Sequence, residues 1–172
     1  MFEFSFTTQS VARGGIPQRV TRPTFEKMIG TIGRHRAADK ASAGWFAAPF
    51  GGTGKRSADN ALRWPIVRLD VDAMPPGAPV PDWFDRLSGI SHETHSSTPE
   101  APRLRGIFET NRPITRDESL LIGAALTADM LEEFGPAVVV DPSTFRPEQP
   151  CFLPPTWAEI RRHEGAPLDA DL

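Results

Sequence analysis

Two aspartates that alternate with apolar residues are the clearest chemical signal in the chain. The alternation over residues 66–72 predicts a β-strand whose apolar side chains share one face. Asp70 and Asp72 then share the other face, with Cα atoms about 6.6 Å apart. Two carboxylates at this spacing repel each other unless a cation lies between them, and hard divalent ions such as Mg²⁺ prefer oxygen ligands. The alternative is an ordinary polar strand end before a loop.

A third acidic residue favours the metal site over that alternative. Asp141 follows the apolar run 137–140, which is typical of a buried strand. Acids that converge at strand ends can bridge divalent cations, and phosphoryl transfer with two metal ions needs such bridging carboxylates. The three acids therefore indicate a divalent-metal site.

A second polar group lies in the stretch 91–97, which is rich in hydroxyl side chains. His92 and His95 are three residues apart rather than four, which excludes the His-Glu-x-x-His zinc helix. On a strand, Glu93 and His95 would point the same way, with the Ser97 hydroxyl just beyond, and such a cluster can hold a triphosphate through hydrogen bonds. A zinc site that combines His92, His95 and Cys151 is an alternative.

Two arginines follow at alternate positions. Arg103 and Arg105 share one face of a strand predicted over residues 104–109. A pair of guanidinium forks on one face suits phosphate groups. The alternative is a solvated strand surface.

The glycine-rich segment 51–57 is similar to a phosphate-binding P-loop but fails the pattern. The P-loop needs Gly where Pro49 stands and Ser or Thr where Arg56 stands. The segment is better interpreted as a basic loop beside a nucleic-acid backbone, with a plain surface turn as the alternative.

The net charge of −3 averages over two different halves. Residues 1–68 contain 11 basic and 4 acidic residues, whereas residues 69–172 contain 8 basic and 18 acidic ones. We expect the basic half to face an anion and the acidic half to gather carboxylates. Lys55, Arg56 and Arg63 in the basic half are the candidates for nucleic-acid contacts.

Composition excludes several classes of protein. The chain has no tyrosine, which excludes replication nucleases that use a tyrosine nucleophile. Its one cysteine forms no disulfide framework, so we expect a reducing, cytoplasmic setting. No signal-peptide pattern opens the chain, and no run approaches the roughly 18 apolar residues of a membrane span, so no membrane partner is expected.

Strand and helix signals interleave along the chain, which predicts an α/β or α+β fold with one sheet, and we expect that sheet to be mixed. Capping boxes begin two of the predicted helices, at Thr115 and at Thr156. Residues 34–63 are predicted to be an ordered loop with short elements. The predicted strands are 2–7, 66–72, 90–95, 104–109 and 137–140, and the predicted helices begin near residues 25, 82, 115 and 156.

Four segments occur in this order along the chain: Leu69-Asp70-Val71-Asp72, Glu93-Thr94-His95-Ser96-Ser97, Pro102-Arg103-Leu104-Arg105 and Val140-Asp141. Together they resemble the motifs of the archaeo-eukaryotic primase superfamily. The resemblance is to plasmid- and phage-borne replication primases and primase-polymerases, which also show segments like Asn111-Arg112-Pro113-Ile114-Thr115, a late Asp-Pro-Ser and a Leu-Pro-Pro. It covers about half of the chain, from Trp64 to Pro155.

The resemblance implies an α+β fold with a mixed or antiparallel sheet and an RRM-like catalytic core flanked by helices. It implies one domain over 1–172, in which a basic N-terminal subdomain (1–63) precedes the catalytic core (64–155) and a short helix and tail (156–172).

The resemblance also implies template-directed nucleotidyl transfer. Asp70, Asp72 and Asp141 would be catalytic ligands of Mg²⁺ or Mn²⁺ at a two-metal site, and His95, Ser97, Arg103 and Arg105 would bind a nucleoside triphosphate, NTP or dNTP. Lys55, Arg56 and Arg63 would contact a single-stranded DNA template.

The chain departs from the family pattern in three respects. Glu93 replaces a small residue two positions before His95, which would crowd or recharge the nucleotide pocket. No cysteine cluster is present for the zinc-binding element of many primases. The chain ends soon after Trp157, so we expect either a catalytic fragment or a helical primase domain or helicase on another chain.

Two other functions remain as alternatives. One is a catalytically inactive nucleotide- or nucleic-acid-binding module with a primase-like fold, and the departure at Glu93 leaves room for it. The other is a metal-dependent hydrolase, which would act without a template.

Overall fold

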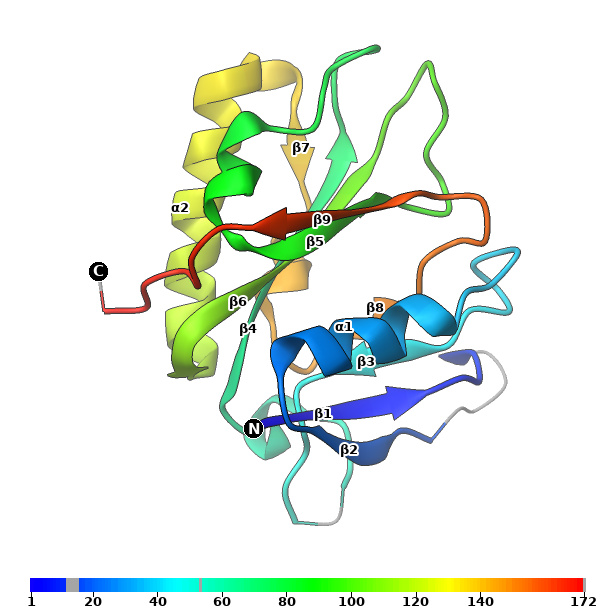
Figure 1. Cartoon of the computed structure of the whole chain (residues 1–172), viewed down its shortest axis with the longest axis vertical. Helices are drawn as coiled ribbons and strands as arrows, with labels where there is room; N and C mark the ends of the chain where they lie inside the picture. The colour runs from blue at the N-terminus through cyan, green and yellow to red at the C-terminus, as the bar shows by residue number, and fades with distance from the viewer. Residues whose placement is uncertain (12–15, 53, 172) are drawn as a thin grey trace.

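Two β-sheets form the frame of the structure, a computed structural model that describes residues 1–11, 16–52 and 54–171 (Figure 1). Thr53, in the glycine-rich segment, lies outside the described residues. The strands are β1 (Phe2–Thr7), β2 (Gln18–Arg22), β3 (Trp45–Ala47), β4 (Trp64–Ala73), β5 (Ser88–Glu93), β6 (Leu104–Ile114), β7 (Val139–Val140), β8 (Cys151–Phe152) and β9 (Ile160–Glu164). The α-helices are α1 (Phe25–Arg34) and α2 (Arg116–Phe134), and the 3₁₀ helices are η2 (Ala58–Asn60), η3 (Asp82–Arg86), η4 (Gly135–Ala137) and η5 (Pro142–Phe145).

The strands form a four-stranded sheet in the order β2-β1-β3-β8 and a five-stranded sheet in the order β7-β4-β6-β5-β9. Each pair of neighbouring strands is antiparallel. The predicted α+β class is therefore confirmed, and of the two predicted sheet types the antiparallel one is found. The expectation of a single sheet is wrong, because the strands divide between two sheets.

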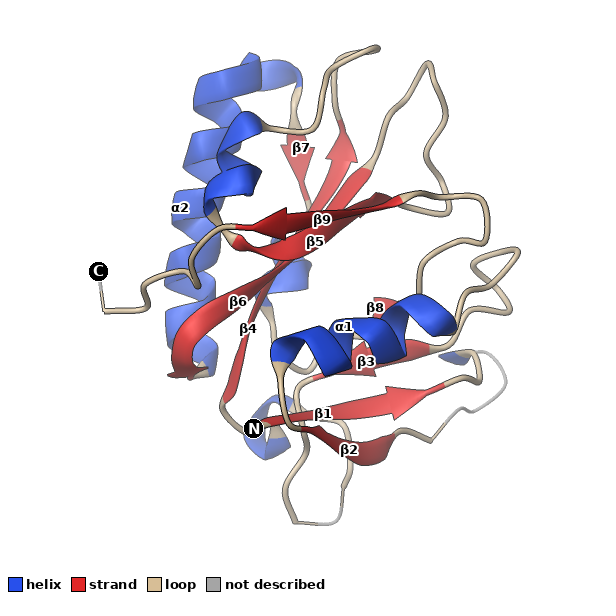
Figure 2. Cartoon of the chain, viewed as in Figure 1, coloured by secondary structure: helices blue, strands red, loops and turns tan. Residues whose placement is uncertain are grey.

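Alternation along β4 divides the core into two clusters. Val67, Leu69 and Val71 face α2 and pack in one cluster, while Ile66 packs in the other with α1 and the four-stranded sheet. Figure 2 shows the same division: α1 lies between the two sheets, and α2 covers the outer face of the five-stranded sheet. The polar residues of the inner face of β4 therefore point into the space between the sheets.

Both helices begin at side-chain caps. The Thr24 hydroxyl accepts a hydrogen bond from the Lys27 N–H at the start of α1. The predicted capping box at Thr115 is confirmed, since Thr115 and Glu118 exchange side-chain to backbone hydrogen bonds at the start of α2. The bond that the Thr115 N–H donates is the main cause that lowers the pKa of Glu118 to about 2.

The segment 141–150 carries the chain from one sheet to the other, and Arg68 of β4 holds it. Arg68 is only 2% exposed. Its guanidinium donates to three backbone carbonyls of the segment: Thr144 (2.9 Å), Arg146 (2.7 Å) and Gln149 (2.7 Å). No carboxylate of the described residues lies within ion-pair distance, and burial lowers the pKa of Arg68. The three carbonyls therefore take the place of a counterion.

Helix α2 holds the same segment from the other side. The Ser119 hydroxyl donates to the Phe145 carbonyl at 2.7 Å. The Phe145 ring packs on Gly123 so closely that a Cβ there would lie 2.2 Å from the ring. Only glycine permits this approach between α2 and η5.

The predicted helix after Thr156 is wrong. Residues 160–164 instead form β9, which pairs with β5. Only seven residues lie between Glu159 and Pro167, which is too short for a stable helix, and β5 needs a hydrogen-bonding partner on that side.

Other boundaries follow the predictions more closely. Residues 35–52 and 54–63, the described part of the predicted loop, contain the short elements β3 and η2, as expected. The strand predicted over 90–95 is shifted to 88–93, and β6 continues to Ile114. Within the described residues, no helix combines the length and the apolar character that a bilayer crossing requires.

We predict that Arg68→Met lowers the free energy of unfolding by about 3 kcal/mol or more, because three carbonyls, one buried and two partly buried, lose their donor. Arg68→Lys will restore little of this, since an ammonium lacks the planar fork. Urea denaturation measures the effect. The control is Arg19→Met, which breaks only an exposed pair with Glu3 and should change stability by less than about 0.5 kcal/mol.

Candidate active site

The inner face of β4 carries Asp70 and Asp72, and each is paired with an arginine. In the sheet register Asp70 lies opposite Arg105 of β6. The Arg105 guanidinium donates to Asp70 Oδ2 in a largely buried ion pair. Arg103 Nη1 lies 3.3 Å from Asp72 Oδ1 in a more exposed pair. Antiparallel pairing thus places the two predicted phosphate-binding arginines beside the two predicted metal ligands.

Asp141 is adjacent to these pairs because β7 runs beside β4. The Asp141 N–H donates to the Asp70 carbonyl at 2.9 Å. The Asp141 carboxylate caps η5, where its two oxygens accept from the Ser143 N–H (2.8 Å) and the Ser143 hydroxyl (2.7 Å). The sequence therefore predicted that Asp141 lies beside the aspartates of β4, but it did not predict the hydrogen bonds between the Asp141 carboxylate and Ser143.

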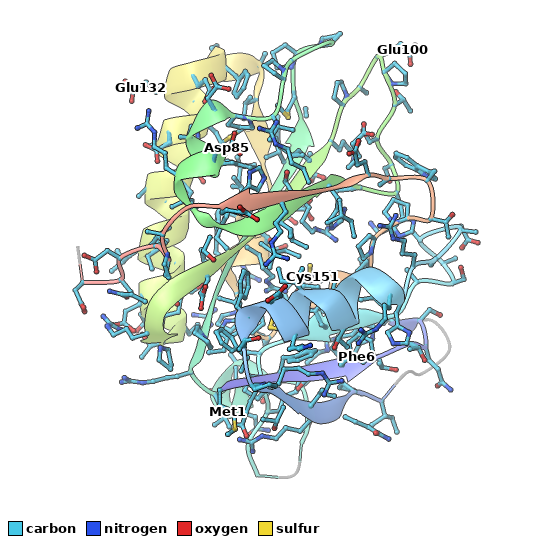
Figure 3. All side chains as sticks on the ribbon, in the orientation of Figure 1. Met1, Phe6, Asp85, Glu100, Glu132 and Cys151 are labelled. Atoms are coloured by element: carbon cyan, nitrogen blue, oxygen red, sulfur yellow. The ribbon has the colours of Figure 1, made fainter. Side chains whose placement is uncertain are left out.

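The three aspartates line one cavity of about 210 Å³ between the sheets. Arg103, Arg105 and Lys40 line it with them, and the segment 144–152 forms its far wall. Figure 3 labels Cys151 of that wall, which lies between the two sheets. We refer to this space as the acid cavity.

A smaller hollow adjoins the acid cavity and shares six of its lining residues. It is lined in addition by the turn that follows β5, through Thr94, His95 and Ser96. The site thus has an acidic end near Asp141 and an end rich in hydrogen-bonding groups near His95. The shared residues are Lys40, Asp70, Asp72, Arg103, Arg105 and Phe152.

Buried polar atoms without a hydrogen-bond partner gather at this site. In the described part of the chain they include Asp70 Oδ1, His95 Nδ1, Arg103 Nε and Arg105 Nε, all on residues that line the two hollows. His92 Nε2, on the residue that pairs with Arg105 in the sheet, is another. Buried donors and acceptors normally find partners, so a cluster of unpartnered ones indicates that a polar ligand completes the site.

His95 keeps one ring nitrogen for such a ligand. Its Nε2–H donates to the Leu153 carbonyl at 2.9 Å, which leaves Nδ1 facing the site without a proton. Burial is the main cause that lowers the pKa of His95 below its usual range. His92 is fully buried, and burial lowers its pKa to about 3, so its ring is neutral at physiological pH.

The carboxylates fit a hard divalent cation by their chemistry, and Asp70 Oδ1 is an oxygen ligand without a partner. Four further oxygens are held: Asp72 Oδ1 by Arg103, Asp70 Oδ2 by Arg105, and both oxygens of Asp141 by Ser143. Accordingly, no group of three or more His, Cys, Asp or Glu side chains in the described residues is arranged to hold a metal ion. His92, His95 and Cys151, the residues of the alternative zinc site, are all described and form no such group either. Metal binding by the three aspartates stays a prediction.

Glu93 does not crowd the site. It is the last residue of β5 and is exposed, and it lines neither the acid cavity nor the smaller hollow but a third one, which Met74, Pro102 and Arg103 also line. The chain turns after it, so Glu93 and His95 do not share a face, contrary to the expectation from a longer strand. The departure from the family pattern at this position therefore leaves the predicted nucleotide pocket unchanged.

Ser97 lies in the turn rather than in the site. Its hydroxyl donates to Glu93 Oε1 at 2.9 Å and accepts from the Arg103 N–H at 3.0 Å. The neighbours Thr94 and Ser96 line the smaller hollow instead. The role of Ser97 that the structure shows is to brace the turn and the start of β6.

Sequence reasoning also missed Lys40 and Phe152, which line both hollows from the opposite wall. Neither belongs to a motif, because residue 40 lies in an irregular segment and β8 has only two residues. Their role depends on the packing of the two sheets, which no local pattern encodes.

Lys55, Arg56 and Arg63 are exposed and line neither hollow. Arg63 directly precedes β4, while Asp70 and Asp72 lie near its other end, about 23 Å and about 30 Å away along an extended strand. The prediction that these residues contact DNA stays open.

A Ser-His-Asp chain lies on the other face of the five-stranded sheet. The Ser91 hydroxyl lies 2.9 Å from His163 Nε2, and His163 Nδ1 lies 2.6 Å from Asp85 Oδ1. Ser91 is 1% exposed and His163 is 3% exposed, so no substrate reaches the hydroxyl. These bonds tie β9 and η3 to β5, and their role is structural.

No protein-family model matches the chain, and no curated protein matches it. A solved structure does match: the AEP (archaeo-eukaryotic primase) domain of the primase-polymerase of cyanophage S-2L. The TM-score is 0.53, the match covers 98% of this chain and 84% of the other, and the sequence identity is 13%. This likeness establishes the fold. The chain has the α+β fold of an archaeo-eukaryotic primase-polymerase domain, as its motifs predicted.

Proposed function

We propose that the protein catalyses template-directed nucleotidyl transfer from nucleoside triphosphates, as a primase-polymerase of plasmid or phage replication. One observation carries the proposal: unpartnered buried donors and acceptors gather around one cavity that also holds three aspartates and three cations. Acids alone would suit a simple metal site, and cations alone would suit a simple anion site. Their combination suits a metal-bound polyphosphate.

The two ends of the site would bind different phosphates of the substrate. The end near His95 and Ser96 offers hydrogen-bonding groups for the outer phosphates, and the end near Asp141 offers carboxylates at the reacting phosphate. A 3′-hydroxyl oxygen attacks the α-phosphorus, the bond from that phosphorus to the bridging oxygen breaks, and pyrophosphate leaves. The side chains orient the triphosphate and balance its charge, which is the main contribution of a protein to phosphoryl transfer.

Asp70, Asp72 and Asp141 would hold Mg²⁺ or Mn²⁺. When bound, the ions supply Lewis acidity: they lower the pKa of the attacking hydroxyl and neutralise charge on the leaving pyrophosphate. Arg103 and Arg105 lie beside the acids, and their planar forks suit phosphate oxygens. Each arginine can therefore pair with either of two anions, the aspartate carboxylate or a phosphate group.

The template is a single strand of DNA in this proposal, with Lys55, Arg56 and Arg63 along its backbone. Their exposed side chains lie within the basic half of the chain, and such side chains track phosphates without reading sequence. A helical primase domain or a helicase on another chain would complete priming.

We predict that Asp70→Asn and Asp72→Asn each reduce nucleotide incorporation by about a hundredfold or more, because each removes charge needed at the reacting phosphate. Asp141→Asn should do the same. The assay follows labelled NTP or dNTP into product on single-stranded DNA with Mg²⁺ or Mn²⁺.

The matched control for these variants is Asp129→Asn, an exposed carboxylate on α2 far from the acid cavity. It should incorporate nucleotides at the wild-type rate. Full incorporation by Asp70→Asn or Asp72→Asn would overturn the proposed function.

Triphosphate binding should take up a proton at His95. Phosphate oxygens only accept hydrogen bonds, whereas His95 Nδ1 carries no proton in the free protein. Burial lowers the pKa of free His95, and the charge of a bound triphosphate raises it. Between these two pKa values the complex holds more protons than the free protein, so affinity rises as pH falls.

Calorimetry of ATP binding in buffers of different ionisation enthalpy measures this proton uptake. His95→Gln is the matched variant, because Gln can bond to phosphate without titrating. Proton uptake that remains equal in the two proteins would come from ATP alone and would contradict the role of His95.

Binding of a triphosphate without transfer is the second candidate function. The ion pairs of Asp70 and Asp72 with Arg105 and Arg103 favour it, because they occupy carboxylate oxygens that catalysis would need. Cation-dependent ATP binding together with absent incorporation would establish this function. Hydrolysis that does not depend on a template would instead indicate a metal-dependent hydrolase.

A further inference from the structure

Lys40 faces the acids from the opposite wall of the site. It lies between α1 and β3, outside the five-stranded sheet that carries the acids and both arginines, and it lines both hollows. Its Nζ lies 5.2 Å from the centre of the Phe152 ring, which lines both hollows as well. An ammonium group in this position reaches a ligand from the side that the arginines do not cover.

Lys40 differs from the two arginines in its partners. Arg105 is paired with Asp70 and Arg103 with Asp72. Lys40 has no carboxylate within ion-pair distance among the described residues, and the adjacent Asp39 instead bonds to Ser42. Only the weak contact with an aromatic ring holds its charge in place. Of the three cations of the acid cavity, Lys40 is therefore the one whose charged group has no carboxylate partner among the described residues.

Charge balance gives Lys40 a second role. Three aspartates face Lys40, Arg103 and Arg105 in the acid cavity, so the charges of these side chains cancel. A triphosphate with two divalent cations has a net charge of about zero, which suits a neutral cavity. Without Lys40 the cavity would carry a net negative charge and would repel phosphate oxygens.

We propose that Lys40 is a phosphate-binding residue that contacts the incoming triphosphate from the wall opposite the acids, before divalent cations are bound. This inference rests on the proposed function and adds an order of events to it. Lys40 captures the triphosphate first. Asp70 and Asp72 would then hold divalent cations in place of Arg105 and Arg103, and the freed guanidinium groups would turn to the phosphates.

ATP binding measured by calorimetry in EDTA and in Mn²⁺ tests the order. The wild type should bind ATP weakly in EDTA and more tightly in Mn²⁺. Lys40→Ala should weaken binding by about tenfold or more in both conditions, since it removes a charged hydrogen bond. Lys40→Arg should retain most of the affinity. Lys27→Ala, an exposed lysine of α1 that lines neither hollow, should bind as the wild type does.

Two further readouts separate this inference from the proposed function. Lys40→Ala should leave the affinity for Mn²⁺ alone, measured by electron paramagnetic resonance, no weaker than in the wild type. Asp70→Asn should lose the gain in ATP affinity that Mn²⁺ gives and keep the binding seen in EDTA.

Two results would overturn the inference: unchanged ATP binding by Lys40→Ala, or wild-type ATP binding that occurs only with Mn²⁺. In either case the proposed function stands if Asp70→Asn still loses the gain in ATP affinity that Mn²⁺ gives. Absence of ATP binding in every protein and condition overturns both. Because Lys40 is exposed, its variants should unfold at the wild-type temperature, which excludes misfolding as the cause of any loss.

Discussion

The site depends on how Arg68 joins the two sheets. The chain leaves the five-stranded sheet after β7 and enters the four-stranded sheet at β8, and Arg68 holds the segment between them by three carbonyls. Asp141 begins that segment, and Cys151 and Phe152 follow it. A buried guanidinium costs solvation energy, which these hydrogen bonds offset. The same bonds fix the distance between the acids on β4 and the wall opposite them, and so the size of the acid cavity.

Asp70 and Asp72 are each paired with an arginine, Asp70 in a largely buried pair and Asp72 in a more exposed one. Cross-strand pairing places an arginine beside each of the two β4 aspartates, so the sheet folds without buried like charges facing one another. The same pairs mean that each ligand must compete with a side chain already in place. Tight binding then requires a phosphate and a divalent cation together. A phosphate that pairs with the arginine frees the aspartate for the cation, and a cation that binds the aspartate frees the arginine for the phosphate.

The amino-acid sequence predicts what alternation and capping encode. It predicts β4 with Asp70 and Asp72 on one face, the helix from the Thr115 capping box, and Asp141 at a strand end. It does not predict the terminal strand β9, because a capping box at Thr156 is a local signal while pairing with β5 is a long-range one. Lys40 was missed for the same reason: its place in the site comes from the packing of two sheets. Local bonds also decide that Ser96 rather than Ser97 lines the smaller hollow.

Strand β9 has a consequence for how the molecule meets its own copies. It is the outermost strand of its sheet, and Arg161, Arg162 and Glu164 on it are exposed. The outermost strand on the other side, β7, has only two residues. The unpaired backbone of an edge strand can otherwise pair with a strand of another chain. Charged side chains on the edge strand, or a very short edge strand, prevent this pairing. The two borders of this sheet therefore disfavour strand pairing between two copies of the protein.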